Sequence, residues 1–379
     1  SGWPPGAPNK SGWPPTLVMA LLLLVQPLQA LVAPSQLVAP SKLVVLSHGL
    51  YGGASNLQVL EDLLVCSGNG DLLVHQASCN EGFTRDGVAA GGQRLAAEVR
   101  ALASSCDSLE SLVLVGNSLG GLYVRYAAAD LLGVDGKMAG LHPSTLCTIG
   151  CPHLGVRRHT FLPLPSQLQA AGVIVAGRTA DDLLLRDAAT PSGSLLAEMA
   201  SCDSRYGRAL AAFERRRLYA NLQGDFMVPF GTAAIEPGWG SGVADSWRMR
   251  RLLAQVEPAS FTDEKVLTGE ADGIGVLWRR GTRSEATVPP SASMRAGENI
   301  DDAIEDEMCN QLNALEWSKV GVGFSGVSSL MPLAHNKLAA LQREGWRKVF
   351  ESIEGAADGE PIMQHAAEYI LSDRDGPRP

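Results

Sequence analysis

The sequence predicts an α/β protein with a mostly parallel central sheet and helices on both faces. Short apolar, β-branched runs are typical of buried strands, and they occur at 43–46, 71–75, 111–115, 145–149 and 217–222. Apolar residues at helical spacing lie between them, at 87–103 and 122–132. Strands that alternate with helices build parallel βαβ units, which cover both faces of the sheet. A further strand at 317–324 and helices at 336–352 and 361–371 are expected to complete the domain.

Composition excludes several classes of protein. The 379 residues are 45% hydrophobic and 19% charged, which is enough apolar material for a buried core. Asp and Glu (40) outnumber Lys and Arg (31), and no dense basic run is present, so we expect no binding to nucleic acid. The seven cysteines are too few for a disulfide scaffold and lack zinc-site spacing. We therefore expect free thiols and no metal.

Residues 1–41 are predicted to be a low-complexity leader outside the fold. SGWPP occurs at 1–5 and 11–15, and LVAPS at 31–35 and 37–41. The apolar run 17–25 is short and is soon interrupted by Gln26 and Pro27, so it fits a targeting sequence better than a membrane span. A membrane anchor, or an apolar segment packed on the domain, remain alternatives. We expect secretory or organelle targeting or membrane association, and otherwise a cytoplasmic protein.

Two stretches interrupt the regular pattern of the predicted domain at 42–373. Residues 156–215 are rich in Leu, Ala and Arg without a clear strand, and we interpret them as a cap or lid. A pair of buried helices would explain them equally well. Residues 236–314 are rich in Gly, Ser and acidic residues, and we expect an acidic, partly mobile insertion with few core contacts.

The segment Gly116–Gly120 has the pattern G-x-S-x-G, with Ser118 at its centre. The pattern alone is weak, but here it directly follows the strand at 111–115 and precedes a helical run. A strand–turn–helix forces the central serine into a strained, exposed elbow. Side chains at Gly116 or Gly120 would collide with the neighbouring strand and helix. We predict that Ser118 is a nucleophile; the alternative is a glycine-rich turn with a bystander serine.

A serine nucleophile needs a base, and the base needs an acid that orients it. In folds with this kind of elbow the three residues follow in the chain order serine, acid, histidine. His335 and His365 are the candidate bases. His365 lies among apolar residues at helical spacing, whereas His335 falls on a loop between a predicted strand and a predicted helix. A catalytic histidine belongs on such a loop, so we favour His335.

Asp225 is the predicted acid because it follows the strand at 217–222, at the sheet edge where the elbow opens. An Asx turn beside Gly224 is the alternative for this residue. Three further acids have the right order in the chain but follow no convincing strand: Asp245, Asp263 and Asp272.

An oxyanion that develops during acyl transfer needs two backbone N–H donors. The amide of Leu119, directly after the nucleophile, is the first. The loop at 48–53 supplies the second, and we predict Leu50, with Tyr51 as the alternative. His48 then has a structural role, holding this loop by hydrogen bonds.

Several segments together resemble a known family: SHGL at 47–50, TRDGVAAGGQRLAAEV at 84–99, GNSLGGLYVRYA at 116–127, CPHLG at 151–155, YANLQGDFMVP at 219–229 and LAHN at 333–336. They are similar to the serine esterases of the lipase-like α/β-hydrolase superfamily, whose members include plant and fungal proteins that act on monoacylglycerols and phospholipids at membranes or lipid droplets. The resemblance covers residues 42–373 and implies the α/β-hydrolase fold. By motif it assigns Ser118, Asp225 and His335 the same three roles. Cys151 replaces the family's usual threonine, and 236–314 is less familiar.

From these observations we expect a serine carboxylic-ester hydrolase, a lipase or esterase that works through an acyl-enzyme without a metal or organic cofactor. The resemblance implies a lipid ester as substrate, a monoacylglycerol or phospholipid, met at a membrane or lipid-droplet surface. The alternatives are a thioesterase or acyltransferase with the same three residues, and a catalytically silent α/β-hydrolase fold that serves as a scaffold.

Overall fold

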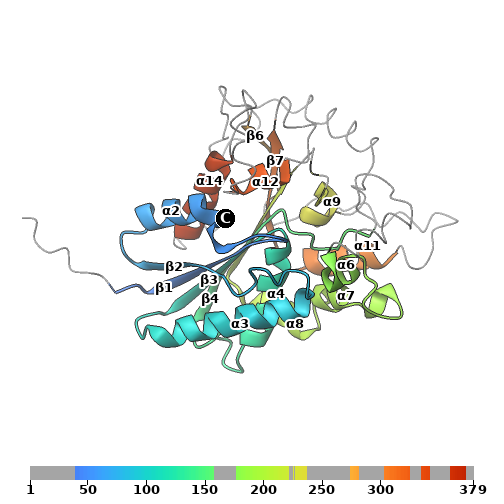
Figure 1. Cartoon of the computed structure of the whole chain (residues 1–379), viewed down its shortest axis with the longest axis horizontal. Helices are drawn as coiled ribbons and strands as arrows, with labels where there is room; N and C mark the ends of the chain where they lie inside the picture. Colours follow the sequence, from blue (N-terminus) through green and yellow to red (C-terminus); the bar gives the residue numbers. More distant parts are fainter. Residues whose placement is uncertain are drawn as a thin grey trace, which may run out of the picture. The chain divides into compact units, whose positions relative to one another are not determined.

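The domain is built around one seven-stranded sheet (Figure 1). The computed structural model describes residues 39–157, 176–221, 225, 227–236, 274–280, 303–324, 334–341 and 359–372, with the backbone alone at 274–280 and 323–324. The strands are β1 (Lys42–Ser47), β2 (Leu72–Gln76), β3 (Ser111–Asn117), β4 (His142–Ile149), β5 (Arg215–Asn221), β6 (Ile274–Arg280) and β7 (Ser318–Phe324). The longer helices are α2 (Gln58–Ser67), α3 (Val88–Ser105), α4 (Leu119–Leu131), α8 (Arg205–Ala212), α11 (Ala303–Asn313) and α14 (Glu360–Leu371). The shorter ones are η1 (Ala54–Leu57), α6 (Arg178–Leu183), η2 (Pro191–Gly193), α7 (Leu195–Ala200), α9 (Phe230–Ala233) and α12 (Ala334–Leu338).

The strand order is β2-β1-β3-β4-β5-β7-β6. Every neighbouring pair is parallel except β6 and β7, which are antiparallel at one edge. The prediction of a mostly parallel sheet is therefore confirmed. Parallel strands all end at the same edge of a sheet, so the segments that follow β1, β3, β4 and β5 meet there, and this edge carries the site described below.

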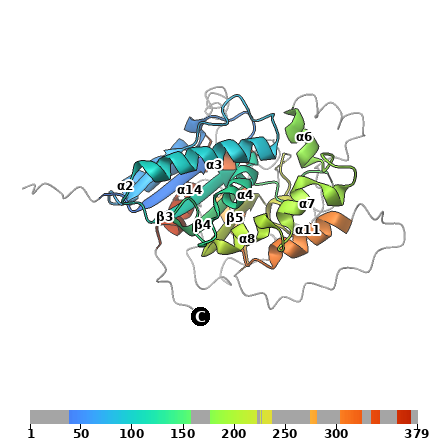
Figure 2. The same cartoon turned by 90° about the horizontal axis from the view of Figure 1, so that it is seen from below.

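Successive side chains of each strand alternate between two apolar cores. Leu112 and Leu114 point into the core beneath α3, α4 and α8, whereas Val113 and Val115 point into the core beneath α2 and α14. Figures 1 and 2 show α2 and α14 on one face of the sheet and α3, α4 and α8 on the other. This three-layer arrangement explains why the strands are continuous apolar runs, because both of their faces are buried.

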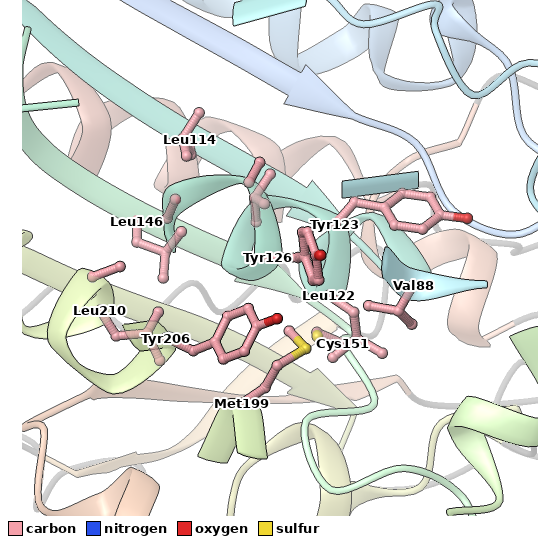
Figure 3. Packing of buried hydrophobic residues seen from close by; sticks show 14 of the residues in the cluster. Val88, Leu114, Leu122, Tyr123, Tyr126, Leu146, Cys151, Met199, Tyr206 and Leu210 are labelled. Atoms are coloured by element: carbon pink, nitrogen blue, oxygen red, sulfur yellow. The ribbon is translucent and has the colours of Figure 1, made fainter. Parts of the chain in front are cut away.

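Two glycines of α3 allow this helix to pack closely against α4. A Cβ atom on Gly91 would lie 2.2 Å from the Tyr123 ring, and one on Gly92 would lie 2.4 Å from the Tyr126 ring. Both tyrosines are buried, and Figure 3 shows Tyr123 near Val88 and Tyr126 on the side of Tyr206. The two glycines therefore lower the helix propensity of α3, but they permit the close contact between α3 and α4.

The described part of segment 156–215 contains α6, α7 and α8. Leu196, Met199 and Leu210 belong to the same core cluster as α3 and α4. Residues 158–175 lie outside the described part of the chain. The cap function that we expect for 156–215 stays a prediction, whereas α7 and α8 contribute to the core of the domain.

Asp182 of α6 caps the N-terminus of α3. One of its carboxylate oxygens accepts the backbone N–H of Val88 at 2.6 Å, where the positive end of the helix dipole favours an acceptor. Burial, reinforced by the neighbouring Asp187 and Asp181, nevertheless raises the pKa of Asp182 from 3.8 to about 6. The folded protein therefore holds a proton on this carboxyl at pH values where the unfolded chain has released it.

The first expected result concerns the pH dependence of stability. A carboxyl whose pKa is raised on folding lowers the free energy of unfolding as pH rises from about 4 to about 6. Asp182→Asn keeps an oxygen for the Val88 N–H but cannot ionise. We expect the melting temperature of the variant to match the wild type near pH 3.5 and to exceed it above pH 7. A difference that stays constant with pH, measured by thermal denaturation, would contradict this.

Helix α11 corrects the expectation that segment 236–314 makes few core contacts. Ile304, Met308 and Leu312 recur every fourth residue on α11, and the latter two are buried in the main core. Glu305 and Asp306 lie in the first turn, where the helix dipole favours acidic residues. The expectation of few core contacts is therefore wrong at 303–314, because the acidic composition obscured a helical apolar stripe. Residues 237–273 and 281–302 lie outside the described part.

The expected helix at 336–352 is wrong in its extent. Helix α12 begins at Ala334 and ends at Leu338, and Ala340 has a left-handed φ of 47°. The N–H of Leu341 donates to Asn336 O and that of Ala340 to Lys337 O, which is the hydrogen-bond pattern of a Schellman stop. Alanine takes the place of the glycine usual there, so no residue at this position signals the end of the helix. Residues 342–358 lie outside the described part.

The predicted leader at 1–41 lies almost wholly outside the described residues, which begin at 39. Among the helices that are described, none combines the length and apolar character needed to cross a bilayer. All seven cysteines are free thiols. Within the described ranges, no group of three or more His, Cys, Asp or Glu side chains is placed to hold a metal ion.

Candidate active site

Ser118 forms the turn between β3 and α4. Its φ of 54° and ψ of −127° are unusual for a residue with a side chain, which is the strained conformation expected of an elbow. A Cβ atom on Gly116 would lie 2.5 Å from Gly120 O, and one on Gly120 would lie 2.3 Å from Ser47 O. These close approaches leave room only for glycine at both positions, because the turn packs directly against the start of α4 and the end of β1.

The structure brings Ser118, His335 and Asp225 together. The Nε2 atom of His335 lies 2.9 Å from Ser118 Oγ, and its Nδ1 atom lies 2.8 Å from Asp225 Oδ2. A carboxylate only accepts hydrogen bonds, so Nδ1 carries the ring proton and Nε2 of the neutral ring can accept from the serine hydroxyl. All three side chains are buried, with Ser118 the most accessible at 8% exposure. The sequence separations between them are 110 and 217 residues, so only the fold creates this chain of hydrogen bonds.

His335 lies in the first turn of α12, not on a loop as the sequence suggested. The segment that follows β4 supports its ring. Gly150 has a φ of 57°, and a Cβ atom there would lie 3.2 Å from His335 Cε1. Gly150 thereby allows the strand end to approach the imidazole, which limits where the ring can move.

The alternative histidine does not contact Ser118. His365 lies on α14, where its Nδ1 atom is 2.9 Å from the Tyr219 hydroxyl and its ring meets that of Tyr219 edge to face. It is the helix-face histidine that its spacing predicted. The alternative acids Asp245, Asp263 and Asp272 lie outside the described residues.

Four donors surround the carboxylate of Asp225. The Oδ1 atom accepts the backbone N–H groups of Met227 and Val228, at 3.0 and 2.8 Å. The Oδ2 atom accepts from His335 and from the side-chain amide of Asn221, at 2.8 Å each. A buried carboxylate is tolerated only when it is hydrogen-bonded in this way, and the four donors also fix its orientation toward the imidazole.

Asn221 is a site residue that sequence reasoning missed. It is 1% exposed at the end of β5, and its Oδ1 atom has no partner among the described residues. A buried asparagine with one unsatisfied oxygen is costly, which suggests that its amide is retained for the Asp225 contact. The only available signal was its position four residues before Asp225, at a strand end.

The second expected result follows from this contact. Asn221→Leu removes one hydrogen bond to a charged group, so we expect kcat to fall by about 10-fold through misorientation of Asp225. Asn313→Leu is the matched control, because the Asn313 amide donates to Ile235 O at 2.9 Å and does not contact the site. Steady-state ester hydrolysis measures both. Equal kcat values for the two variants would show that Asn221 does not orient Asp225.

The predicted oxyanion residues lie beside Ser118. Leu119 is the first residue of α4, so its N–H has no partner within the helix. A Cβ atom on Gly49 would lie 2.7 Å from Ser118 Cβ, so the loop that carries Leu50 lies directly against the serine. The N–H of Tyr51 already donates to Thr84 Oγ1 at 3.1 Å, which disfavours Tyr51 as the second donor.

Arg125 holds the segment that follows Gly150. Its guanidinium is completely buried and donates to the carbonyls of His153 and Met199, at 3.2 and 2.9 Å. Burial lowers the pKa of Arg125 to about 10 and, together with the charge of Arg125, lowers that of His153 well below its ordinary value. Burial also raises the pKa of the nearby Cys151 thiol to about 12, so this thiol stays protonated and is not a competing nucleophile.

Two curated fungal proteins are similar to this chain. The chain is 27% identical over 268 residues to "Putative lipase C4A8.10" of Schizosaccharomyces pombe, a match that covers 66% of this chain and 32% of that protein. It is 29% identical over 214 residues to "Putative lipase ROG1" of Saccharomyces cerevisiae, covering 53% of this chain and 30% of that protein. The matched part of the chain thus spans about a third of the length of each relative.

Among solved structures, the chain is similar to phospholipase PlaB from Legionella pneumophila in complex with thio-NAD. That match has 17% sequence identity and a TM-score of 0.31, and it covers 49% of this chain and 39% of that chain.

The family described as "Putative serine esterase (DUF676)" matches residues 38–236, more than half of the 379-residue chain. The matched range contains β1, the elbow at Ser118 and Asp225. With its sheet order and its strand–turn–helix, the domain has the α/β-hydrolase fold, and the chain belongs to this serine esterase family.

Proposed function

We propose that the protein is a serine carboxylic-ester hydrolase that works through an acyl-enzyme. The observation that carries the proposal is the continuous chain of hydrogen bonds from Ser118 through His335 to Asp225. A serine hydroxyl is too weakly acidic to attack an ester unaided, and this chain supplies the base and its orienting acid. Membership of a serine esterase family supports the same reaction class.

In the proposed mechanism Ser118 Oγ attacks the ester carbonyl carbon while its proton moves to His335 Nε2. Asp225 stabilises the imidazolium through Nδ1–H without becoming protonated. The tetrahedral intermediate collapses when His335 returns the proton to the leaving alcohol, which departs and leaves an ester on Ser118. A water molecule then attacks this ester while His335 takes its proton. The bond from the acyl carbon to Ser118 Oγ breaks as His335 returns that proton to the serine oxygen, which releases the free acid and restores the serine hydroxyl.

The negative charge on the carbonyl oxygen in both tetrahedral intermediates would be stabilised by the backbone amides of Leu119 and Leu50. Leu119 lies at the N-terminus of α4, where the helix dipole also favours negative charge. Preorganised donors of this kind supply about 2.7–4 kcal/mol each in serine hydrolases.

The proposed substrate class is a lipid ester, such as a monoacylglycerol or a phospholipid, met at a membrane or lipid-droplet surface. The names of the two yeast relatives support this class for the family. Exposed apolar side chains on the loops of the site give independent support: Tyr51 in the oxyanion loop is 53% exposed, and Met227, two residues after Asp225, is 47% exposed. An exposed apolar side chain on each of these two loops suits a substrate with an apolar acyl chain.

The test compares substrates and acceptors in one assay. Purified wild type and Ser118→Ala are incubated with a monoacylglycerol, a phospholipid, a short-chain ester and an acyl-CoA thioester, with and without a competing alcohol, and the products are identified by mass spectrometry. We expect free fatty acid from the lipid esters with wild type only. Faster thioester cleavage would instead favour a thioesterase, and transfer to the alcohol an acyltransferase. A folded wild type that turns over none of them would favour the catalytically silent scaffold.

A further inference from the structure

The oxyanion loop is held in a defined turn. Gly49 O accepts the backbone N–H of Gly52 at 3.0 Å, and the side chain of His48 donates to the same carbonyl from Nδ1 at 3.0 Å. Tyr51 lies between them with a left-handed φ of 54°, which a residue with a side chain adopts only when its surroundings hold it there. The two hydrogen bonds on Gly49 O fix the peptide plane that contains the Leu50 N–H, since a trans peptide is planar.

Thr84 supplies the hydrogen bond from outside the turn. Its side-chain oxygen accepts the N–H of Tyr51 at 3.1 Å, across 33 residues of sequence. Thr84 is only 2% exposed, although it lies in the loop between β2 and α3 and its neighbour Phe83 is 56% exposed. Thr84 is thus a buried hydroxyl on an otherwise exposed loop. It accepts a hydrogen bond from Tyr51, the residue after the proposed oxyanion donor.

The loop around Thr84 is anchored firmly enough to serve as a support. Arg94 of α3 donates to Asn80 Oδ1, to Asp86 Oδ2 and to Phe83 O, at 2.8 to 2.9 Å. Asn80 in turn donates to Gly91 O at 3.0 Å, in a buried contact. These bonds tie both sides of Thr84 to a helix whose glycines are packed on α4, so Thr84 has little freedom to move.

The backbone carbonyl of Thr84 accepts a hydrogen bond from segment 156–215. The hydroxyl of Thr179, one residue into α6, donates to Thr84 O at 2.7 Å and accepts the Gly87 N–H at 3.0 Å. The hydroxyl of Tyr123 on α4 also donates to Thr84 O, at 3.4 Å. Thr179 and Tyr123 are completely buried. Thr84 therefore contacts the oxyanion loop through its side chain, and both α4 and the expected cap segment through its backbone.

From these contacts we infer that Thr84 is a positioning residue of the oxyanion hole, and that α6 braces it there. The inference rests on the proposed hydrolase function and adds a residue to it. Thr84 touches neither substrate nor oxyanion. It acts through Tyr51, whose held N–H keeps the turn that carries the proposed donor, the Leu50 amide, in one conformation beside Ser118. A donor must lie about 2.7–3.1 Å from the developing oxyanion, so a small shift of this turn weakens the stabilisation of the transition state.

The test uses Thr84→Val, which removes the hydroxyl at nearly constant volume, and Thr84→Ser, which keeps it. Thr145→Val is the matched control, because Thr145 is completely buried on β4 and its hydroxyl accepts from Arg215 at 2.9 Å outside the site. All are full-length proteins. The readouts are kcat and KM for the best ester, the inhibition constant of a trifluoromethyl ketone whose hemiketal oxyanion needs the same donors, and the melting temperature.

We expect Thr84→Val to lower kcat by about 10-fold, less than the roughly 100-fold or greater effect of deleting an oxyanion donor, with KM changed by less than about twofold. The inhibition constant of the ketone should rise by the same factor as kcat falls. Thr84→Ser should restore both, and Thr145→Val should change neither.

The brace from α6 is tested by a double-mutant cycle. Thr179→Val removes the hydroxyl that bonds Thr84 O, and we expect a smaller fall in kcat with KM unchanged. If both residues act through the same turn, the double variant should lose less than the product of the two single losses. If the fall in kcat of the double variant equals the product of the two single falls, α6 does not act through Thr84.

Three results overturn the role of Thr84 itself. One is an unchanged kcat in Thr84→Val; another is an equal fall in Thr84→Val and Thr84→Ser. The third is a fall in kcat without weaker binding of the ketone, since a merely structural role would not alter the two together. A wild type that hydrolyses no ester overturns the proposed function as well, so the two failures are distinguishable.

Discussion

Replacing Ser118 with alanine is expected to abolish ester hydrolysis, lowering kcat by about 10⁴ to 10⁶-fold. Within the described part of the chain, the Ser118 side chain is the only group within hydrogen-bond distance of His335 Nε2 that can attack an ester, and its oxygen lies 2.9 Å from that nitrogen. The nearby Cys151 cannot replace it, because burial raises the pKa of its thiol to about 12. Residual turnover would come from binding and from the oxyanion donors alone.

The control for this variant is Ser144→Ala, because Ser144 lies near the start of β4 and its hydroxyl contacts only Thr145 among the described residues. Alanine at 118 keeps the unusual φ and ψ of the elbow, so we expect the melting temperature to stay within a few degrees of the wild type. Hydrolysis rates measured over a range of ester concentrations, beside thermal denaturation, separate loss of chemistry from loss of fold. A Ser118→Ala protein with more than a tenth of the wild-type kcat would contradict the account.

Replacing Asp225 with asparagine is expected to lower kcat by about 10⁴-fold while the fold is kept. The four groups around this side chain are all donors, and a carboxylate can accept from every one of them. Asparagine has one acceptor oxygen. If that oxygen stays with the Met227 and Val228 amides, its NH₂ group faces the amide of Asn221 and the Nδ1 atom of His335.

An NH₂ group beside Nδ1 favours the tautomer of His335 with its proton on Nε2, the atom that must accept from Ser118. The ring is then present but in the wrong protonation state, so kcat should fall far more than KM rises. Asp62→Asn, at an exposed position of α2, is the control. A fall in kcat of less than 10-fold in Asp225→Asn would mean that the acid does not orient His335.

Local patterns explain which parts of the fold could be predicted from the sequence. The strands β1, β3, β4 and β5 are continuous apolar runs because helices bury both faces of the sheet. The elbow could be predicted because its glycines, its strand and its helix are adjacent in the chain. His335 could be chosen over His365 because the helical spacing of apolar residues around His365 is a local property, and His365 indeed lies on α14.

The elements that were not predicted depend on tertiary context. The apolar stripe of α11 is diluted by acidic residues at its start, and it becomes recognisable only because Met308 and Leu312 enter the main core. Helix α12 ends at Leu338 through backbone hydrogen bonds around Ala340. Because alanine stands where glycine is usual, the sequence contains no glycine that would mark this end. Asn221 and Thr84 have ordinary sequence surroundings, and their contacts with the site arise when segments distant in the chain meet at the carboxyl edge of the sheet.

Fluorophosphonate labelling of the 379-residue chain is the direct test of Ser118 as an activated nucleophile, because the reagent reacts preferentially with activated serines. Wild type, Ser118→Ala, His335→Ala and His365→Ala are labelled side by side, and the modified peptide is identified by mass spectrometry. We expect label on Ser118 in wild type and in His365→Ala, and little or none in the other two. A folded wild type that stays unlabelled, or a His335→Ala protein that labels as fast as wild type, would contradict it.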